Sequence, residues 1–146
     1  MQEGEKGVET PEGGVTREVA EKDINRWLDY RRIRKKKREK NEDGINELIE
    51  LVEDGIISVD EDCNITLELQ QPIKNATGST AVQNLVFKPR LKQQEVSKHL
   101  KGAGTDVDAR VSAYIAAATE QSKGVLSKLD VSDYNIAQSI ALFFLV

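Results

Sequence analysis

The chain has 146 residues, of which 38% are hydrophobic and 32% are charged, and its formal net charge at pH 7 is -4. This length fits one domain of ordinary size, and the composition lies short of that of a disordered chain, which has fewer aliphatic residues and a larger charge imbalance. One cysteine excludes an intramolecular disulfide. With only one histidine beside it, the usual cysteine–histidine metal clusters and catalytic triads are also excluded within one chain.

The first 22 residues are rich in glycine and glutamate and contain few large apolar side chains. This composition predicts a flexible, acidic, glycine-rich arm over residues 1–22. No apolar core follows a basic start, and the segment is too acidic for a transit peptide, so we expect neither a secretory signal nor an organelle signal.

Residues 23–55 are predicted to form a charged helical hairpin. Asp23 is the expected N-cap of the first helix, whose apolar stripe contains Ile24, Trp27 and Leu28. The second helix, "INELIELVEDG", repeats apolar residues at helical spacing and is predicted to end at Gly55. We expect "NEDG", residues 41–44, to separate the two helices.

The segment between these stripes, "RRIRKKKREK" over residues 31–40, contains eight basic residues in ten and cannot face a core. With two preceding aromatic residues it has the ingredients of non-specific nucleic-acid binding, namely cations for phosphates and rings for bases. A solvated helix face or a dock for an acidic partner is the alternative interpretation, because the chain is acidic overall. The candidate residues of this surface are Trp27, Tyr30, Arg31, Arg32, Arg34, Lys35, Lys36, Lys37 and Arg38.

Residues 56–146 are predicted to form a small α+β domain. "IISV", "ITLELQQPI" and "AVQNLVFK" are typical of three short strands in a small antiparallel meander. Three helical patterns follow, with Thr105 and Ser132 as the expected N-caps of the second and third. The predicted fold class is therefore α+β, with an N-terminal charged helical hairpin, a small antiparallel meander and a C-terminal helical cluster.

Catalysis is poorly supported by the sequence. No carboxylate pair lies in an apolar context, and no glycine motif has the spacing that holds phosphates. Asp60, Asp62 and Asn64 have the alternating spacing of a calcium loop, but Ile65 stands where that loop requires glycine, so a polar hairpin turn is expected. His99 has no second ligand to join it. We predict a protein without catalytic residues, cofactor or metal, which is not an enzyme.

The chain ends on an apolar run, residues 140–146, which is far shorter than the ~20 residues of a membrane-spanning helix. We therefore expect no membrane association. Two interpretations remain open: the run is the last part of the core, or it is a surface that a partner covers. The candidate partner-binding residues are Tyr134, Ile140, Leu142, Phe143, Phe144 and Leu145.

The order of features from Asn64 onward resembles a known family. A strand ending in an apolar–proline step, a polar loop, the segment "LVFKPRLKQQEV", an alanine-rich helix and the closing "LSKLDVSDYNIAQSIALFFL" are similar to the tail assembly chaperones of long-tailed phages related to lambda and Mu. In that family leucines surround an Asp–Tyr pair that an apolar helix follows. The matching residues here are Leu126, Leu129, Asp130, Asp133, Tyr134, Phe143, Phe144 and Leu145.

This resemblance implies a non-enzymatic role in the host cytoplasm. A protein of this family binds the long, helical tape-measure protein and keeps it soluble until tail-tube subunits polymerise around it. The implied partners are the tape-measure protein or other phage tail proteins, and a homo-oligomer remains an open alternative. A structural tail or baseplate component of the virion, or a nucleic-acid-binding accessory protein that acts through residues 31–40, are the alternative functions.

Overall fold

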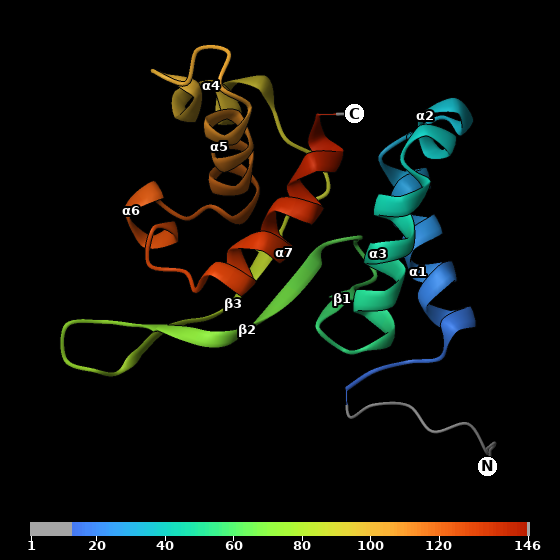
Figure 1. The fold of residues 1–146 in the computed structure, drawn as a ribbon, viewed down its shortest axis with the longest axis horizontal. Coiled ribbons are helices and arrows are strands. Elements are labelled where there is room, and N and C mark those ends of the chain that lie inside the picture. Colours follow the sequence, from blue (N-terminus) through green and yellow to red (C-terminus); the bar gives the residue numbers. More distant parts are fainter. Residues whose placement is uncertain (1–12, 146) are drawn as a thin grey trace. The chain divides into compact units, whose positions relative to one another are not determined.

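The structure is a computed structural model, and it describes residues 13–145 (Figure 1). The fold class is confirmed as α+β: helices come first, strands follow, and a helical cluster ends the chain. In chain order the elements are α1 (Arg17–Tyr30), α2 (Lys35–Lys40), α3 (Glu42–Glu53), β1 (Ile57–Val59), β2 (Ile65–Lys74), β3 (Thr80–Phe87), α4 (Gln93–Leu100), α5 (Val107–Thr119), α6 (Lys123–Leu126), α7 (Val131–Ala141) and the short 3₁₀ helix η1 (Leu142–Phe144).

The chain divides into two compact units, which we name the N-terminal unit (Met1–Cys63) and the C-terminal unit (Asn64–Val146). The sequence placed this boundary after residue 55. The structure instead keeps β1 and the turn after it with the N-terminal helices, because α1 and α3 both pack on β1. Each unit is described by itself below.

Helix α1 begins seven residues earlier than predicted. Its N-cap is Thr16, whose hydroxyl accepts a hydrogen bond from the backbone N–H of Val19 at 3.3 Å, whereas the expected cap, Asp23, lies inside the helix. The apolar stripe explains the difference, because Ala20 extends it by one turn and is fully buried. The predicted arm is therefore wrong for residues 17–22, which are helical, and residues 1–12 lie outside the described part.

A left-handed residue ends α1. Arg32 has φ 57°, and its N–H donates to the carbonyl of Asp29 at 3.0 Å, while the N–H of Ile33 donates to Leu28 at 3.0 Å. These two bonds form a Schellman motif, in which the left-handed position usually holds glycine. Ile33 and Leu28 are both buried, as the apolar contact of this motif requires. The basic segment therefore does not continue α1, and α2 starts only at Lys35.

Helices α1 and α3 are antiparallel neighbours. Arg17 at the start of α1 pairs with Glu53 at the end of α3, with 2.9 Å between Nη1 and Oε1. The interruption predicted over residues 41–44 is confined to Asn41, because α3 begins at Glu42 and includes Gly44. Gly55 follows α3 with φ +75°, and an added Cβ would lie 2.7 to 2.9 Å from backbone atoms of Gly13 and Gly14, so the close approach of these segments requires glycine.

Strands β2 and β3 are antiparallel, with Ile65 opposite Phe87 and Leu67 opposite Leu85. Their register shifts between Glu68 and Ile73, where β2 contains Pro72. Proline has no N–H to donate to a ladder, so it is found in strands at edges and bulges. Before the shift, Ile65, Leu67 and Leu69 alternate toward the core, as the sequence predicted.

Helices of the C-terminal unit pack on this strand pair. α7 contacts β2, and α5 contacts β3 as well as α4, α6 and α7, so α5 is the centre of the helical cluster (Figure 1). Its alanines permit this close packing, since Ala113, Ala116, Ala117 and Ala118 are all buried. The N-caps differ by one or two residues from those predicted: Asp106 caps α5 and Asp130 caps α7.

Candidate functional site

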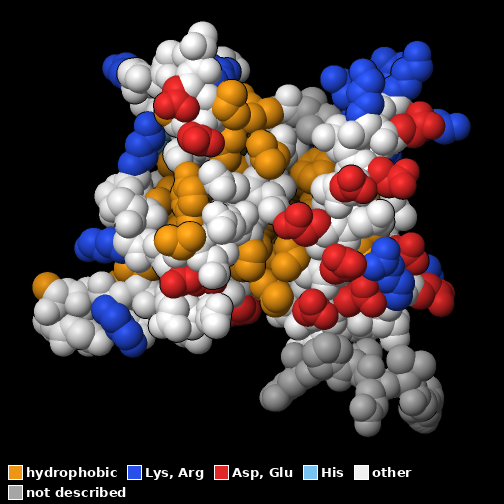
Figure 2. All heavy atoms as spheres, in the orientation of Figure 1, with side chains coloured by type: hydrophobic (Ala, Val, Ile, Leu, Met, Phe, Trp, Pro, Cys, Tyr) orange, Lys and Arg blue, Asp and Glu red, His pale blue; other side chains and the backbone are white. Residues whose placement is uncertain are grey.

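A pocket of about 410 Å³ lies between α5, α6 and the start of α7. Its walls are mostly apolar, and it falls in the size range of ligand and side-chain pockets, about 300 to 1,000 Å³. The lining side chains belong to Ser112, Lys123, Leu126, Ser127, Leu129, Val131 and Tyr134. Figure 2 shows hydrophobic side chains reaching the surface over α5, α6 and α7, the helices that form the pocket.

Local capping places the leucines of this pocket. The Ser122 hydroxyl accepts a hydrogen bond from Val125 N–H at 3.1 Å and caps the start of α6. In this short helix the Leu126 side chain faces the interior and is 6% exposed. Asp130 then accepts from Ser132 N–H at 2.9 Å and starts α7. Leu129 lies between these two caps and Val131 directly follows the second, and both line the pocket.

Asp133 and Tyr134 fix the position of α7. Asp133 is 2% exposed, and its two carboxylate oxygens accept hydrogen bonds from the backbone N–H groups of Gln70 and Gln71 at 3.0 and 3.1 Å. These two N–H groups lie in the part of β2 where the register shifts. The carboxylate therefore accepts hydrogen bonds from backbone donors in the irregular part of the strand pairing. The hydroxyl of Tyr134 is hydrogen-bonded to that of Ser112 on α5. The Asp–Tyr pair therefore holds the pocket walls in place.

The apolar end of the chain is only partly a surface. Ile140 is fully buried and Phe143 is 3% exposed, so both belong to the core and neither is accessible to a partner. Leu142 and Leu145 are 47% and 38% exposed. Phe144 is half-buried and stacks on Tyr114 of α5, with 6.2 Å between ring centroids. The sequence left core and surface open for this run, and the structure divides it between the two.

The predicted partner-binding residues thus lie at both ends of α7. Tyr134 lines the pocket at the start of the helix, whereas Leu142 and Leu145 follow its last residue. Val131 of the pocket wall and Leu142 are eleven residues apart, which is about 16 Å at 1.5 Å per residue. The pocket wall formed by Leu126, Leu129 and Val131 was not among the predicted site residues, although the leucines stood in the motif that carried the resemblance.

A second hollow, of about 300 Å³, lies beside α4 and the end of α5 and includes His99, Glu95 and Glu120. Partial burial lowers the pKa of His99, and the positive charges of Lys98 and Lys123 lower it further. Lys88 pairs with both Glu95 and Glu120, and the hydrogen bond to Glu95 raises the pKa of Lys88 and lowers that of Glu95. These contacts tie the end of β3 to α4 and α5.

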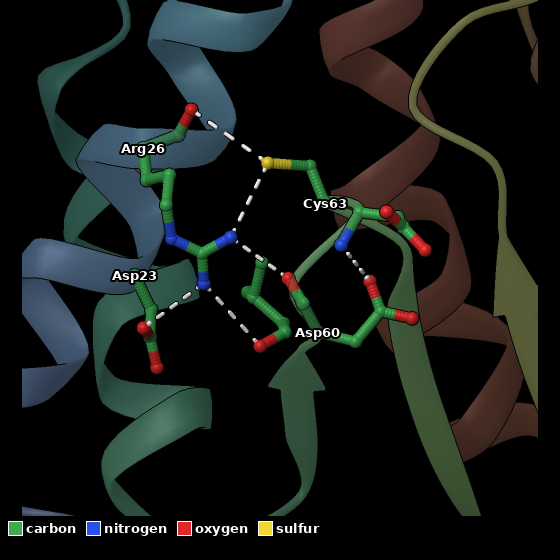
Figure 3. Close-up of polar contacts among 6 residues, drawn as sticks. Asp23, Arg26, Asp60 and Cys63 are labelled. Carbon is green, nitrogen blue, oxygen red and sulfur yellow. Dashed lines mark hydrogen bonds and ion pairs between the residues drawn. The ribbon is translucent and has the colours of Figure 1, made fainter.

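Cys63 is held in a structural contact of the N-terminal unit (Figure 3). It is 3% exposed, and its Sγ accepts a hydrogen bond from the Arg26 guanidinium at 3.4 Å. The same guanidinium donates to the carbonyl oxygens of Asp60 and Val59 at 2.7 and 3.5 Å and pairs with Asp23 at 3.2 Å. Arg26 therefore fastens β1 and the following turn to α1.

Asp60 and Asp62 lie in a polar turn, as the sequence predicted. The Asp60 carboxylate accepts a hydrogen bond from the backbone N–H of Asp62 at 2.9 Å. Among residues 13–145, no group of three or more His, Cys, Asp or Glu side chains is placed to hold a metal ion. Nor does any helix within that range combine the length and apolar character needed to span a membrane.

The basic segment is exposed, but the aromatic part of the predicted nucleic-acid surface is not intact. Trp27 is 1% exposed and lies in the core, with the Arg31 guanidinium 5.3 Å from the ring centroid. It cannot stack on a base, so its predicted role is wrong. Tyr30 is 47% exposed. Arg38 pairs with Asp29 at 2.7 Å and is only partly exposed, whereas Arg32, Arg34, Lys35, Lys36 and Lys37 are exposed.

Comparison of the chain with protein-family models, with curated proteins and with solved structures found no match.

Proposed function

We propose that the chain is a non-enzymatic binding protein of the phage tail assembly chaperone type, whose client is the tape-measure protein. The observation that carries the proposal is the apolar pocket between α5, α6 and α7. Its lining includes Leu126, Leu129 and Tyr134, three of the residues through which the sequence resembles this family. The resembling segment, residues 64–146, also coincides with the C-terminal unit, which supports treating it as one binding module.

The pocket suits the apolar face of a client helix. Helix-in-groove recognition inserts apolar side chains spaced three or four residues apart, and a pocket of about 410 Å³ has room for one or two of them. Leu142 and Leu145, about 16 Å away along α7, offer a second apolar contact to the same helix. A client helix of about three turns would span this distance. The chaperone function follows if the covered client face is one that would otherwise aggregate.

The test uses two matched valines. Val131 lines the pocket rim, is 73% exposed and is the first residue of α7 after the cap Asp130. Val107 is 62% exposed and is the first residue of α5 after the cap Asp106, away from the pocket. Val131→Glu and Val107→Glu therefore make the same chemical change in the same local setting, and neither removes a core side chain. Truncation at Ile140 is less informative, because it deletes three buried residues, Ile140, Ala141 and Phe143.

Tagged full-length protein and both variants are used to capture partners from a nuclease-treated extract of the phage-producing host, and bound proteins are identified by mass spectrometry. We expect the wild type and Val107→Glu to retain one very long helical protein and Val131→Glu to retain about tenfold less, a loss of ~1.4 kcal/mol. Equal capture by all three proteins would contradict the pocket as the client site. Recovery of tail-tube or baseplate subunits in place of the long helical protein would make the chain a virion component instead.

A further inference from the structure

The segment between α1 and α3 concentrates positive charge, most of which no ion pair within residues 13–145 neutralises. Five side chains within six residues are exposed, and no ion pair joins any of them to an acidic side chain within residues 13–145. We name these five residues the basic tip: Arg32, Arg34, Lys35, Lys36 and Lys37. Figure 2 shows Lys and Arg side chains gathered at α2, with acidic side chains over the neighbouring α3.

The basic tip is held in a fixed shape. Ile33 is buried in its middle, and the Arg38 guanidinium donates to the Ile33 carbonyl at 2.7 Å while pairing with Asp29. Arg34 and Lys35 to Lys37 surround a hollow of about 390 Å³ at the surface. Cations held close together repel one another, and an anionic ligand relieves this repulsion without first having to order the segment.

Arg32 adds an independent observation. It occupies the left-handed position of the Schellman motif, where glycine has no steric cost and a residue with a Cβ is strained. A residue that violates a local rule of stability marks a position where another property is retained. Arg32 places a positive charge at this strained position, beside the four other cations of the basic tip.

The surroundings of the basic tip limit the length of its ligand. Exposed carboxylates of Asp29, Glu39, Glu42 and Asp43 flank it in the sequence, and residues 13–63 contain 11 basic and 14 acidic residues. A long polyanion would run from the tip into this acidic surface, within the Debye length of about 8 Å at physiological salt. The tip itself spans roughly 10 Å, the length of about three to four extended residues.

From this geometry we infer that the basic tip binds a short acidic segment of a partner protein, with about four consecutive carboxylates in contact. A nucleic acid fits less well, because each further phosphate outside the tip meets acidic side chains. The inference uses only residues of the N-terminal unit and does not rest on the proposed function of the C-terminal unit.

The test measures fluorescence anisotropy of labelled oligoglutamate peptides of about four, eight and sixteen residues, and of oligothymidylates with similar numbers of phosphates, with the full-length protein at about 0.05 and 0.2 M salt. We expect the peptides to bind, and their affinity to stop rising between four and eight residues. We expect oligothymidylates of equal charge to bind more weakly. Tighter binding of the oligothymidylates, with affinity that rises with each added length, would overturn the inference in favour of nucleic acid.

Two variants locate the site. Replacing Lys35, Lys36 and Lys37 together by Glu should weaken peptide binding at least about tenfold, since it reverses three of the five charges. The matched control makes the same charge change at Lys98, Lys101 and Lys128, exposed residues of the C-terminal unit, and should bind within about threefold of wild type. Equal loss in both variants, or absence of peptide binding by the wild type, would overturn the inference.

Arg32→Gly separates binding from stability. Glycine removes the strain of the left-handed position, so we expect the urea midpoint to rise while peptide affinity falls about two- to fivefold. A lower midpoint would show that Arg32 is retained for stability. An unchanged affinity would remove Arg32 from the site and with it the argument from strain.

Discussion

The N-terminal and C-terminal units expose different chemistry. Met1–Cys63 contains 12 basic and 18 acidic residues, against 9 and 7 in Asn64–Val146. The N-terminal unit presents a cluster of exposed cations on a short segment, and the C-terminal unit presents an apolar pocket. Both described buried polar side chains, Thr119 and Asp133, belong to the C-terminal unit. In the C-terminal unit, buried side-chain hydrogen bonds hold the helices that form the pocket. In the N-terminal unit, the exposed cations need only a backbone that hydrogen bonds hold in place.

The largest expected effect concerns the buried carboxylate. Asp133→Ala leaves the N–H groups of Gln70 and Gln71 without their acceptors in a buried place, so we expect the free energy of unfolding to fall by about 3 kcal/mol. Urea unfolding followed by far-ultraviolet circular dichroism measures this loss. Trp27, the one tryptophan of the chain, reports on the N-terminal unit by fluorescence in the same experiment.

If the two units unfold independently, Asp133→Ala should shift the dichroism transition and leave the Trp27 transition in place. Coincident shifts would show that the two units unfold cooperatively as one. The units would then differ in the chemistry of their surfaces but not in their stability. The control Asp108→Ala changes an exposed carboxylate on α5 and should cost less than about 0.5 kcal/mol.

The second prediction tests the N-terminal unit. Gly55→Ala introduces a Cβ at φ +75° and within 2.9 Å of the Gly13 and Gly14 backbone, so we expect a loss of about 2 kcal/mol in the Trp27 transition. Gly124→Ala is the control. Gly124 lies in α6, where the nearest atom to an added Cβ is the Ser122 hydroxyl at 3.8 Å, and alanine there should stabilise by about 0.5 kcal/mol. Equal effects of the two substitutions would show that the close approach does not constrain Gly55.

The third prediction concerns Arg26, whose hydrogen bonds join β1 and the following turn to α1. Arg26→Lys keeps the charge but loses the planar fork that reaches two carbonyls and the Cys63 sulfur, so we expect a loss of about 1 kcal/mol. Reaction of Cys63 with a thiol reagent should accelerate, since the turn around this buried cysteine loosens. Arg110→Lys on α5 is the control substitution. An unchanged rate of Cys63 modification would mean that packing alone holds the turn.

The smallest expected effect is a pH dependence in the C-terminal unit. The folded chain lowers the pKa of His99 below its ordinary value of 6.5, so the unfolded chain binds the proton first as the pH falls. This group therefore makes no difference above about pH 7.5, and it destabilises the fold as the pH drops below 6.5. Urea midpoints of the wild type and His99→Gln should differ more at pH 5.5 than at pH 7.5, with the variant less sensitive to acid. Parallel pH profiles would contradict the assignment.

Much of the secondary structure followed from local pattern. The alternation of Ile65, Leu67 and Leu69 predicted β2, and all three are buried. The helical stripe of Ile24, Trp27 and Leu28 predicted the core face of α1 but not its start, because Ala20 is a weak apolar signal and Thr16 was not recognised as a cap. The end of α1 after Tyr30 could not be predicted from residue type. The left-handed position that ends a helix is usually recognised by a glycine, and here it holds Arg32.

The candidate site could be predicted only in part. Tyr134 was expected at a partner surface and lines the pocket, but Ile140 and Phe143 were expected there too and are buried. Apolar composition does not distinguish a core residue from a surface that a partner covers, because both exclude water. The prediction for Trp27 was wrong for a similar reason. An aromatic residue beside basic residues has the composition of a nucleic-acid surface even when its ring faces the core.

By itself the sequence determined the fold class and the exposure of the basic segment, because a run of cations cannot be buried without partners. Only the tertiary structure decided which residues form a site. The bond between Tyr134 and Ser112 and those from Gln70 and Gln71 to Asp133 join positions 22 to 63 residues apart. Contacts at such separations depend on how helices pack on strands, which local periodicity does not encode.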